Sequence, residues 1–152
     1  MNYTIRKSQR QDCYTLSKSI RSADVQEIFA SSGKNPIQVL LRAYLCSYNY
    51  CYTILLDNKI VGMFGVSKLR DAIGSPWLLG SNFLTKYPYS FQKKSKEYLD
   101  NFMTDFKILF NYIDKRNTIS IRWLKMLGFK FTNLITEYGY QQKPFYEFIK
   151  VR

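Results

Sequence analysis

The stretch that most constrains the fold of this chain runs from Asn117 to Phe129, with the sequence NTISIRWLKMLGF. It opens with Asn, a residue favoured at helix N-termini, and continues without Gly or Pro as far as Gly128. Gly128 predicts the end of the helix, and Phe129 starts a β-like run. Residues 107–114 (KILFNYID) are apolar and aromatic, which predicts a buried strand before the helix. The unit is therefore a strand, a short turn, a helix, a glycine and a second strand.

Hydrophobic periodicity and turn residues predict the other elements in order. Strands are expected at residues 3–6, 51–56, 59–66, 74–83, 130–134 and 145–150, and helices at residues 12–20, 22–33, 36–48 and 88–106. Asp12 is expected to cap the first helix, and either Ser22 with Glu27 or Asp24 to supply the capping oxygens of the second. Asp57-Asn58 is expected to form a tight hairpin turn. A three-strand meander followed by a strand–helix–strand crossover predicts a mixed sheet covered by helices, in one α/β domain that spans residues 1–152.

The composition fits a folded domain and removes several kinds of chemistry. The chain is 46% hydrophobic and 17% aromatic, and it contains no His, which excludes Ser–His and Cys–His pairs and a histidine base. Cys13, Cys46 and Cys51 lack CxxC spacing, so we expect buried free thiols and no metal site. No stretch reaches the roughly 18 apolar residues of a membrane span, and the N-terminus lacks an apolar signal region. We therefore expect a cytoplasmic protein without membrane contact.

The formal net charge of +12 attracts anions such as nucleic acid, phosphorylated cofactors or an acidic protein surface. The alternative is a set of lysines scattered over a solvated surface, because the charges form no long block. Lys93, Lys94 and Lys96 stand in the first turns of a predicted helix that follows Pro88, where they oppose the helix dipole. This placement indicates either an anion at that helix end or a solvated lysine face.

The element order together with NTISIRWLKMLGF resembles the GNAT acyltransferase superfamily, in which a helix begins at an Asn and ends in a Gly-Phe step. The matching residues are Asn117, Ile121, Leu127, Gly128 and Phe129. The resemblance implies a three-layer GNAT-like domain whose mixed, mostly antiparallel sheet is covered by helices on both faces. It covers nearly the whole chain, and the short motif is moderately specific.

A narrower resemblance is to the internal virion protein A group of short-tailed phages. Its features are the aromatic strand before the Asn, the helix pattern N-T-x-x-I-R-[FW]-L-K-x-[IL]-G, and a basic helix that carries Phe91. This resemblance implies a phage-encoded protein in the host cytoplasm or associated with the virion. Its partners would then be phage or host proteins.

The superfamily resemblance implies acetyl-CoA as the cofactor and N-acyl transfer as the reaction. Glu27 is then expected to be the base, and Tyr138 or Tyr140 the acid. The expected cofactor-binding residues are Leu79 and Gly80, through backbone N–H groups beside a splayed sheet, together with Lys93, Lys94 and Asn117. The alternatives are a solvated helix position for Glu27, packing or rim positions for the tyrosines, and a simple N-cap for Asn117.

Two departures from the superfamily pattern bear on function. Members of the superfamily hold the coenzyme A pyrophosphate on a glycine-containing loop at a helix N-terminus, where small residues let backbone N–H groups approach the phosphates. Here the equivalent stretch, LTKYPYSFQKKSKEYL, has no glycine, and Tyr87 and Tyr89 would crowd the approach. Many members also carry a Tyr seven residues after the Asn as the acid, and that position here is Leu124, which donates no proton.

These features leave three functions to compare. The first is an acyl-CoA-dependent N-acyltransferase or a CoA-binding protein with a degenerate phosphate loop. The second is a GNAT-like protein without catalysis that serves phage morphogenesis or binds a host protein. The third, motivated only by charge and aromatic content, is a nucleic-acid-binding protein, although no known nucleic-acid-binding motif is present. An open or a filled cleft between the strands at Trp77 and Lys107 would separate the first from the second.

Overall fold

The computed structural model describes residues 3–86 and 88–152, apart from the side chains of Pro88 and Tyr89. The predictions about Tyr87 and about the Tyr89 side chain therefore lie outside the described residues. Within the described ranges, none of the helices is long and apolar enough to cross a membrane.

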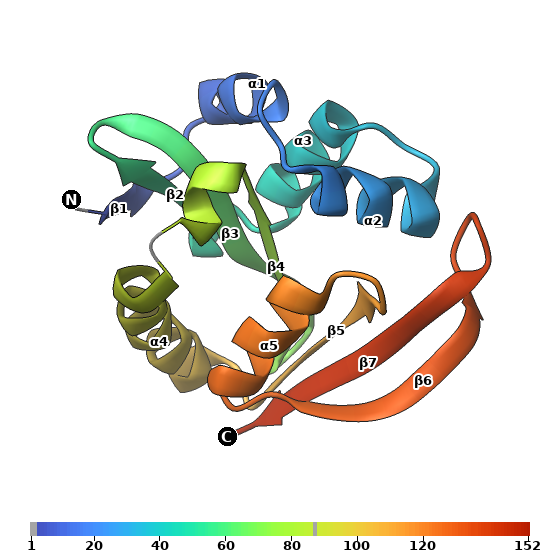
Figure 1. Ribbon diagram of the computed structural model, residues 1–152. Helices are drawn as coiled ribbons and strands as arrows, with labels where there is room; N and C mark the ends of the chain where they lie inside the picture. The colour runs from blue at the N-terminus through green and yellow to red at the C-terminus, as the bar shows by residue number, and fades with distance from the viewer. Residues whose placement is uncertain (1–2, 87) are drawn as a thin grey trace.

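The described strands form one mixed sheet with the order β1-β2-β3-β4-β5-β7-β6 (Figure 1). Neighbouring strands are antiparallel except β4 and β5, which are parallel. The strand bounds are β1 Tyr3–Lys7, β2 Cys51–Leu56, β3 Lys59–Arg70, β4 Ile73–Gly80, β5 Ile108–Asp114, β6 Lys130–Tyr138 and β7 Lys143–Val151. The β2–β3 hairpin turns at Asp57 and Asn58, which both have positive φ as a two-residue hairpin requires.

The helices cover both faces of the sheet, as Figure 1 shows. Their bounds are α1 Arg10–Ser17, α2 Ser22–Ser32, α3 Pro36–Cys46, α4 Pro88–Asp105 and α5 Thr118–Met126, with 3-10 turns η1 Tyr48–Tyr50 and η2 Asn82–Thr85. Helices α1 to α3 pack through Leu16, Ile28 and Leu40 on one face. Helices α4 and α5 pack on the other through Phe102 and Leu124. The predicted three-layer α/β architecture with a mostly antiparallel sheet is confirmed.

The start of α1 corrects one prediction. Asp12 does not stand at the N-cap; Gln9 does, and Asp12 lies three residues further on, where its Oδ2 accepts the Gln9 N–H at 2.8 Å. The same buried carboxylate accepts from Arg6 at 2.7 Å and from Thr53 at 2.7 Å. The strand β1 and the strand β2 thus bring partners that a local capping rule does not consider. A second correction is Cys46, which is exposed, whereas Cys13 and Cys51 are buried free thiols.

Strands β4 and β5 stay together only at their first residues. Ile73 pairs with Ile108 and Gly74 with Leu109, and no later pair follows. Pro76, the next residue of β4 with the same orientation, has no N–H to donate, so the ladder cannot continue through it. Its carbonyl oxygen accepts instead from the Asn111 side chain at 2.8 Å. Beyond this point the two strands diverge and open the sheet.

Gly128, which follows the C-cap of α5, is a position where a side chain is expected to lower the stability of the fold. Gly128 has φ of +90°, a conformation that side chains rarely adopt. We expect Gly128→Ala to lower the free energy of unfolding by about 1 to 2 kcal/mol, measured by urea denaturation. Gly128→Asn is the control, because Asn tolerates left-handed backbone better and so loses less stability. Equal losses for both variants would contradict a conformational cause.

Candidate functional site

The divergence of β4 and β5 opens a cavity of about 260 Å³. Its walls come from both faces of the sheet: α2 and α3 on one side, α4 and α5 on the other, with β7 and the end of β6. Aromatic side chains dominate the α4–α5 side, namely Phe64, Phe91, Tyr98, Phe102 and Trp123. The cleft beside Trp77 is therefore open. It is the strongest candidate for a ligand site in the described part of the chain.

A buried polar network joins α2 to the start of α5 at one edge of this cavity. It consists of Arg21, Asp24, Glu27, Asn117 and Ser120. Arg21 Nη2 donates to Asp24 Oδ1 at 2.9 Å, to Asn117 Oδ1 at 2.8 Å and to Ser120 Oγ at 2.6 Å. Arg21 is 7% exposed and Asp24 4%, so the ion pair is withdrawn from water. Buried charges of this kind require the full set of partners seen here.

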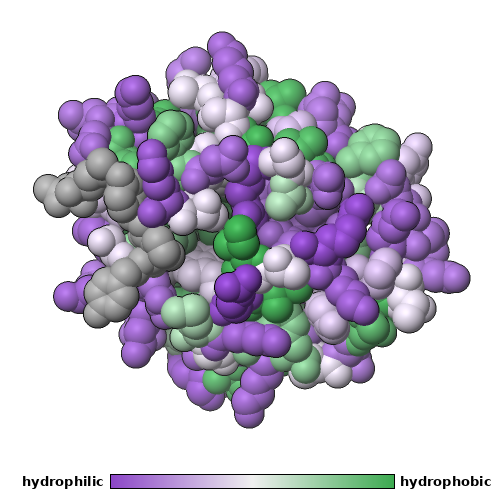
Figure 2. Space-filling model, viewed as in Figure 1, coloured by the Kyte–Doolittle hydropathy of each residue, from purple (hydrophilic) through white to green (hydrophobic). Residues whose placement is uncertain are grey.

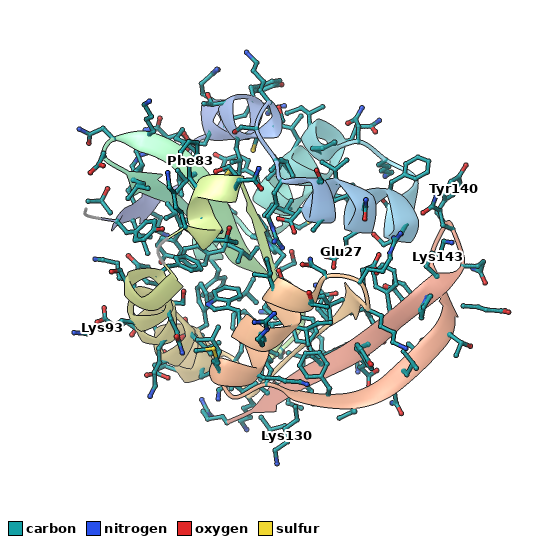
Figure 3. The ribbon with its side chains drawn as sticks, viewed as in Figure 1. Glu27, Phe83, Lys93, Lys130, Tyr140 and Lys143 are labelled. Atoms are coloured by element: carbon teal, nitrogen blue, oxygen red, sulfur yellow. The ribbon has the colours of Figure 1, made fainter. Side chains whose placement is uncertain are left out.

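Glu27 projects from the middle of α2 toward β5 (Figure 3). Its Oε1 accepts the backbone N–H of Asp114 at 2.9 Å and the Asn117 side-chain amide at 3.2 Å. Among the described residues Oε2 has no hydrogen-bond partner, and the residue lines the cavity. Burial, reinforced by the nearby carboxylates of Asp24 and Asp114, raises the pKa of Glu27 to about 7. A carboxylate with this pKa and one free oxygen can take a proton near neutral pH.

Asn117 stands at the N-cap of α5, but its side chain makes no capping hydrogen bond. Its amide instead donates to Glu27 and, at 3.4 Å, to Asp24, while its carbonyl oxygen accepts from Arg21. The prediction of a simple N-cap is therefore wrong. The residue is 3% exposed and lines the cavity, so it orients Glu27. Its predicted contact with a cofactor stays a prediction.

The backbone donors predicted at Leu79 and Gly80 are both engaged. In an antiparallel ladder alternate residues direct their N–H and C=O groups to opposite neighbours. Gly80 faces away from β3, and its N–H donates to Asp24 Oδ2 at 3.1 Å while its carbonyl oxygen accepts from Arg21 N–H at 2.9 Å. Ser81 N–H donates to Val61 of β3, so Leu79, two residues before, faces β3 as well.

The free backbone groups in the opening belong to Leu78 instead. Leu78 has the same orientation as Gly80 and Pro76, away from β3 and toward the gap. Within the described ranges no hydrogen bond of its N–H or C=O is found, and the residue lines the cavity. The expected donor thus shifts by one residue, because Asp24 occupies the N–H of Gly80.

Of the two tyrosines predicted as the acid, only Tyr138 lines the cavity. Tyr138, at the end of β6, lines the cavity and stacks on Tyr112 with a ring-centroid distance of 4.9 Å. Burial, with smaller effects of Tyr112 and Glu27, raises the pKa of Tyr138, so its phenol is protonated at neutral pH. Tyr140 is 67% exposed and packs against Phe29 on α2, outside the cavity. The role of Tyr138 as an acid stays a prediction.

Comparison with known proteins identifies the architecture. Ard1 from Thermoplasma volcanium has a TM-score of 0.80 at 14% identity, over 99% of this chain and 98% of that one. A GNAT-family acetyltransferase from Bacillus anthracis gives 0.74 at 12%, over 99% and 95%. A phosphinothricin acetyltransferase from Sinorhizobium meliloti, solved in complex with AcCoA, gives 0.71 at 14%, over 99% and 89%. The chain has the GNAT fold.

Sequence comparison adds one phage-related match. A protein family described as "Bacteriophage T7, probable scaffold protein Gp13" matches residues 74–138, less than half of the chain. No curated protein matches the chain. At the identities found, the solved structures establish the GNAT fold alone. The matched range runs from the second residue of β4 to the end of β6, so it includes the two strands, β4 and β5, between which the cleft opens.

The lysines predicted for phosphate binding lie outside the cavity. Lys93 and Lys94 are exposed on the second turn of α4, and Figure 3 shows Lys93 directed away from the ribbon. Hydrophilic residues cover most of the face seen in Figure 2, so hydrophilic side chains are not confined to this helix. A second cavity, of about 370 Å³, lies between η2, α4 and α5, where Arg122 and Gln92 contribute polar groups.

The second cavity shares one unusual group with the first. Trp123 lines both cavities, stacks on Phe91 at 5.1 Å between ring centroids, and has a buried Nε1 without a hydrogen-bond partner among the described residues. Buried donors are normally paired, so this N–H is available to a ligand acceptor. In contrast, the described residues hold no group of three or more acidic or thiol side chains that could bind a metal ion.

Sequence reasoning missed the site roles of three residues. The prediction that Asp24 caps α2 is wrong, because α2 has no side-chain cap bond and the Asp24 carboxylate accepts from the Arg21 side chain and the Gly80 N–H. Arg21 and Asp24 form the centre of the polar network, and Leu78 presents the free backbone groups. Arg21 and Asn117 are 96 positions apart, so no local pattern links them. The only available signal was the Arg-x-x-Asp spacing at the start of a predicted helix, which reads equally as an exposed surface pair.

Proposed function

We propose that the cleft between β4 and β5 binds an acyl-CoA thioester and that the protein transfers the acyl group to an amine. The observation that carries this proposal is Glu27, whose pKa is raised to about 7 and whose Oε2 is free beside the opening in a GNAT fold. The apolar, aromatic walls suit a narrow uncharged arm. The unpaired C=O of Leu78 suits an amide N–H of such an arm, because that bond would satisfy the free carbonyl oxygen, and the Leu78 N–H is left for the acyl group.

Each residue then has one task. Acetyl-CoA, when bound, supplies an acyl group activated as a thioester. The Leu78 N–H polarises the acyl carbonyl oxygen, Glu27 Oε2 takes the proton that the attacking amine loses, and Tyr138 donates a proton to the departing sulfur. Asn117 holds Glu27 through its amide. The C–N bond forms as the C–S bond breaks, and one proton moves from the amine to Glu27 while another moves from Tyr138 to the thiolate.

The phosphate end of the ligand is the part that fits least well. Residues 81–86 and 90–99 contain no glycine that would let backbone N–H groups surround a pyrophosphate. We propose that Lys93 and Lys94 supply charge in place of these backbone donors. Such contacts are looser and more sensitive to salt than a glycine cradle.

A titration with acetyl-CoA tests the binding. At a ligand concentration of 100 times Kd, the free energy of unfolding should rise by about 2.7 kcal/mol, which a thermal-shift or calorimetric assay detects. We expect Lys93→Glu with Lys94→Glu to weaken binding about tenfold at low salt and to flatten its salt dependence. The control is Lys130→Glu with Lys143→Glu, which makes the same charge change at exposed positions of β6 and β7.

Two outcomes would contradict parts of this proposal. If millimolar acetyl-CoA does not stabilise the wild-type chain, the cleft does not bind acyl-CoA. If both double variants weaken binding equally, only the overall charge acts, and the phosphate site is not on α4.

A second candidate function rests on the family match to a phage scaffold protein. In that case the GNAT fold serves virion assembly in the host cytoplasm or within the particle, through contact with a phage or host protein and without acyl transfer. It predicts that the chain co-purifies with particles when Glu27 is replaced by Gln, and that acetyl-CoA has no effect on its stability. Stabilisation by acetyl-CoA together with loss of acyl transfer in that variant would contradict it.

A further inference from the structure

We infer that the acceptor of this site is a primary amine on an apolar body with no carboxylate beside the amine. The inference rests on the proposed function and names its substrate class. Its first observation is the charge of the cavity. The chain has 23 Lys and Arg residues, yet none of them lines the cavity among the described residues, and the charged residues that do are Asp24 and Glu27.

Apart from Asp24, Glu27 and Ser31 of α2, the wall on the α2–α3 side is apolar. Ile28, Val39, Ala43 and Leu79 form it together with Trp77. The Trp77 indole N–H donates to Ser47 Oγ at 2.8 Å, so its polar atom is engaged elsewhere and its ring faces the cavity as an apolar surface. This wall suits an aliphatic or aromatic group and offers no partner for a second charge.

The β6–β7 turn contacts the end of α2 at Ser31, which lines the cavity. Tyr140 N–H donates to the Ser31 carbonyl oxygen at 3.1 Å, and Gln141 N–H donates to the Ala30 carbonyl oxygen at 2.9 Å. Gly139 approaches Ser31 so closely that a Cβ would lie 2.7 Å from its backbone. The turn therefore sits on the end of α2 (Figure 1), and its residues 139–142 include no Lys or Arg that could reach the cavity from this side.

An α-amino acid is a poor fit to these surroundings. Its carboxylate would lie one carbon from the amine that Glu27 must reach, and therefore close to the Glu27 carboxylate. The Arg21 guanidinium is already bonded to Asp24, Asn117 and Ser120 and does not line the cavity, so among the described residues no free cation is left there for a second carboxylate. Like charges at that range oppose binding, and a charge without a partner in an apolar wall is costly. An amine without the carboxylate, or one whose carboxyl group is in an amide bond, avoids both penalties. A free amine and the amino end of a peptide share this chemistry.

Three compounds with one aromatic body test the inference. They are phenethylamine, phenylalaninamide and phenylalanine, which differ only in the group on the carbon that bears the amine: hydrogen, carboxamide or carboxylate. We expect kcat/KM for acetylation at pH 8 to be at least tenfold higher for each of the first two than for phenylalanine. A higher value for phenylalaninamide than for phenethylamine indicates a peptide end as the source, and the reverse order indicates a free amine.

A variant gives the test a second readout. Val39→Lys places a cation in the apolar wall, so we expect the preference against phenylalanine to fall at least threefold, while Val39→Met leaves it unchanged. Turnover of phenylalanine at a rate equal to that of the other two overturns the substrate class but leaves the proposed function in place. Acetyl-CoA binding without acetylation of any of the three also overturns the inference. Absence of acetyl-CoA binding instead overturns the proposed function itself, and the inference with it.

Discussion

Replacement of Glu27 by Gln is expected to lower kcat for acyl transfer by about 10² to 10⁴-fold, the usual contribution of a general base. Gln keeps the shape and one acceptor oxygen for the Asp114 N–H, so the fold should be preserved while proton uptake is lost. The measurement is steady-state acetylation of phenethylamine. Glu137→Gln is the matched control, since Glu137 is exposed on β6 and outside the cavity. Equal rates for the two variants would remove Glu27 from the mechanism.

The pH dependence of the rate separates a base from a structural residue. As the proposed base, Glu27 would accept a proton only when it is deprotonated, and its pKa is about 7, so kcat/KM should rise with pH through a step centred near 7. Glu27→Gln should lack this step and retain only the rise caused by titration of the amine substrate. A step that persists in the variant would belong to another group.

The same pKa has a consequence for stability. The folded-state pKa of about 7 is above the ordinary value of 4.5, so the folded chain binds more protons than the unfolded chain between these pH values. The contribution of Glu27 to stability is therefore complete below about pH 4.5 and is lost as the pH rises through 7. Since 1.36 kcal/mol corresponds to one pH unit, the loss is up to about 3 kcal/mol. Urea denaturation at pH 5 and pH 8 should show this loss in the wild type but not in Glu27→Gln.

The fold could be predicted because its signals are local. Periodicity located the helices, Pro36 and Gly33 marked helix ends, and Asp57-Asn58 marked the hairpin. Each of these depends on residues within one turn or one strand, where sequence spacing determines contact.

The site could be predicted only in part, because its geometry depends on distant segments. Glu27 and Tyr138 were named from a resemblance, and both line the cavity. Asn117 was expected to cap its own helix, but Arg21 and Glu27 compete for its side chain. The N–H of Gly80 was expected to be free, but Asp24, 56 positions earlier, accepts it. In each case a buried charged side chain from an element distant in the sequence forms the hydrogen bond, and a rule based on neighbouring residues cannot predict it.

The second large prediction concerns the stability that Arg21 contributes through the buried polar network. Arg21→Met leaves the Asp24 carboxylate buried without its cation, and it removes the hydrogen bonds that Arg21 donates to Asn117 and Ser120. We therefore expect the free energy of unfolding to fall by about 3 to 5 kcal/mol. Asp24→Asn alone should also destabilise, because it leaves the guanidinium unpaired. The double variant should cost less than the sum of the two, since neither charge is then stranded. Strictly additive losses in urea denaturation would show that the two residues are not coupled.

The same variants reveal what the buried pair does for the base. Asp24 raises the pKa of Glu27, and Arg21 offsets the charge of Asp24. The step in kcat/KM should therefore move to higher pH in Arg21→Met, where Asp24 is left uncompensated, and to lower pH in Asp24→Asn. Arg21→Lys keeps the charge but loses the planar fork, so its step should stay near the wild-type pH although its stability falls. A step that follows stability instead of charge would mean that the network holds the fold without tuning Glu27.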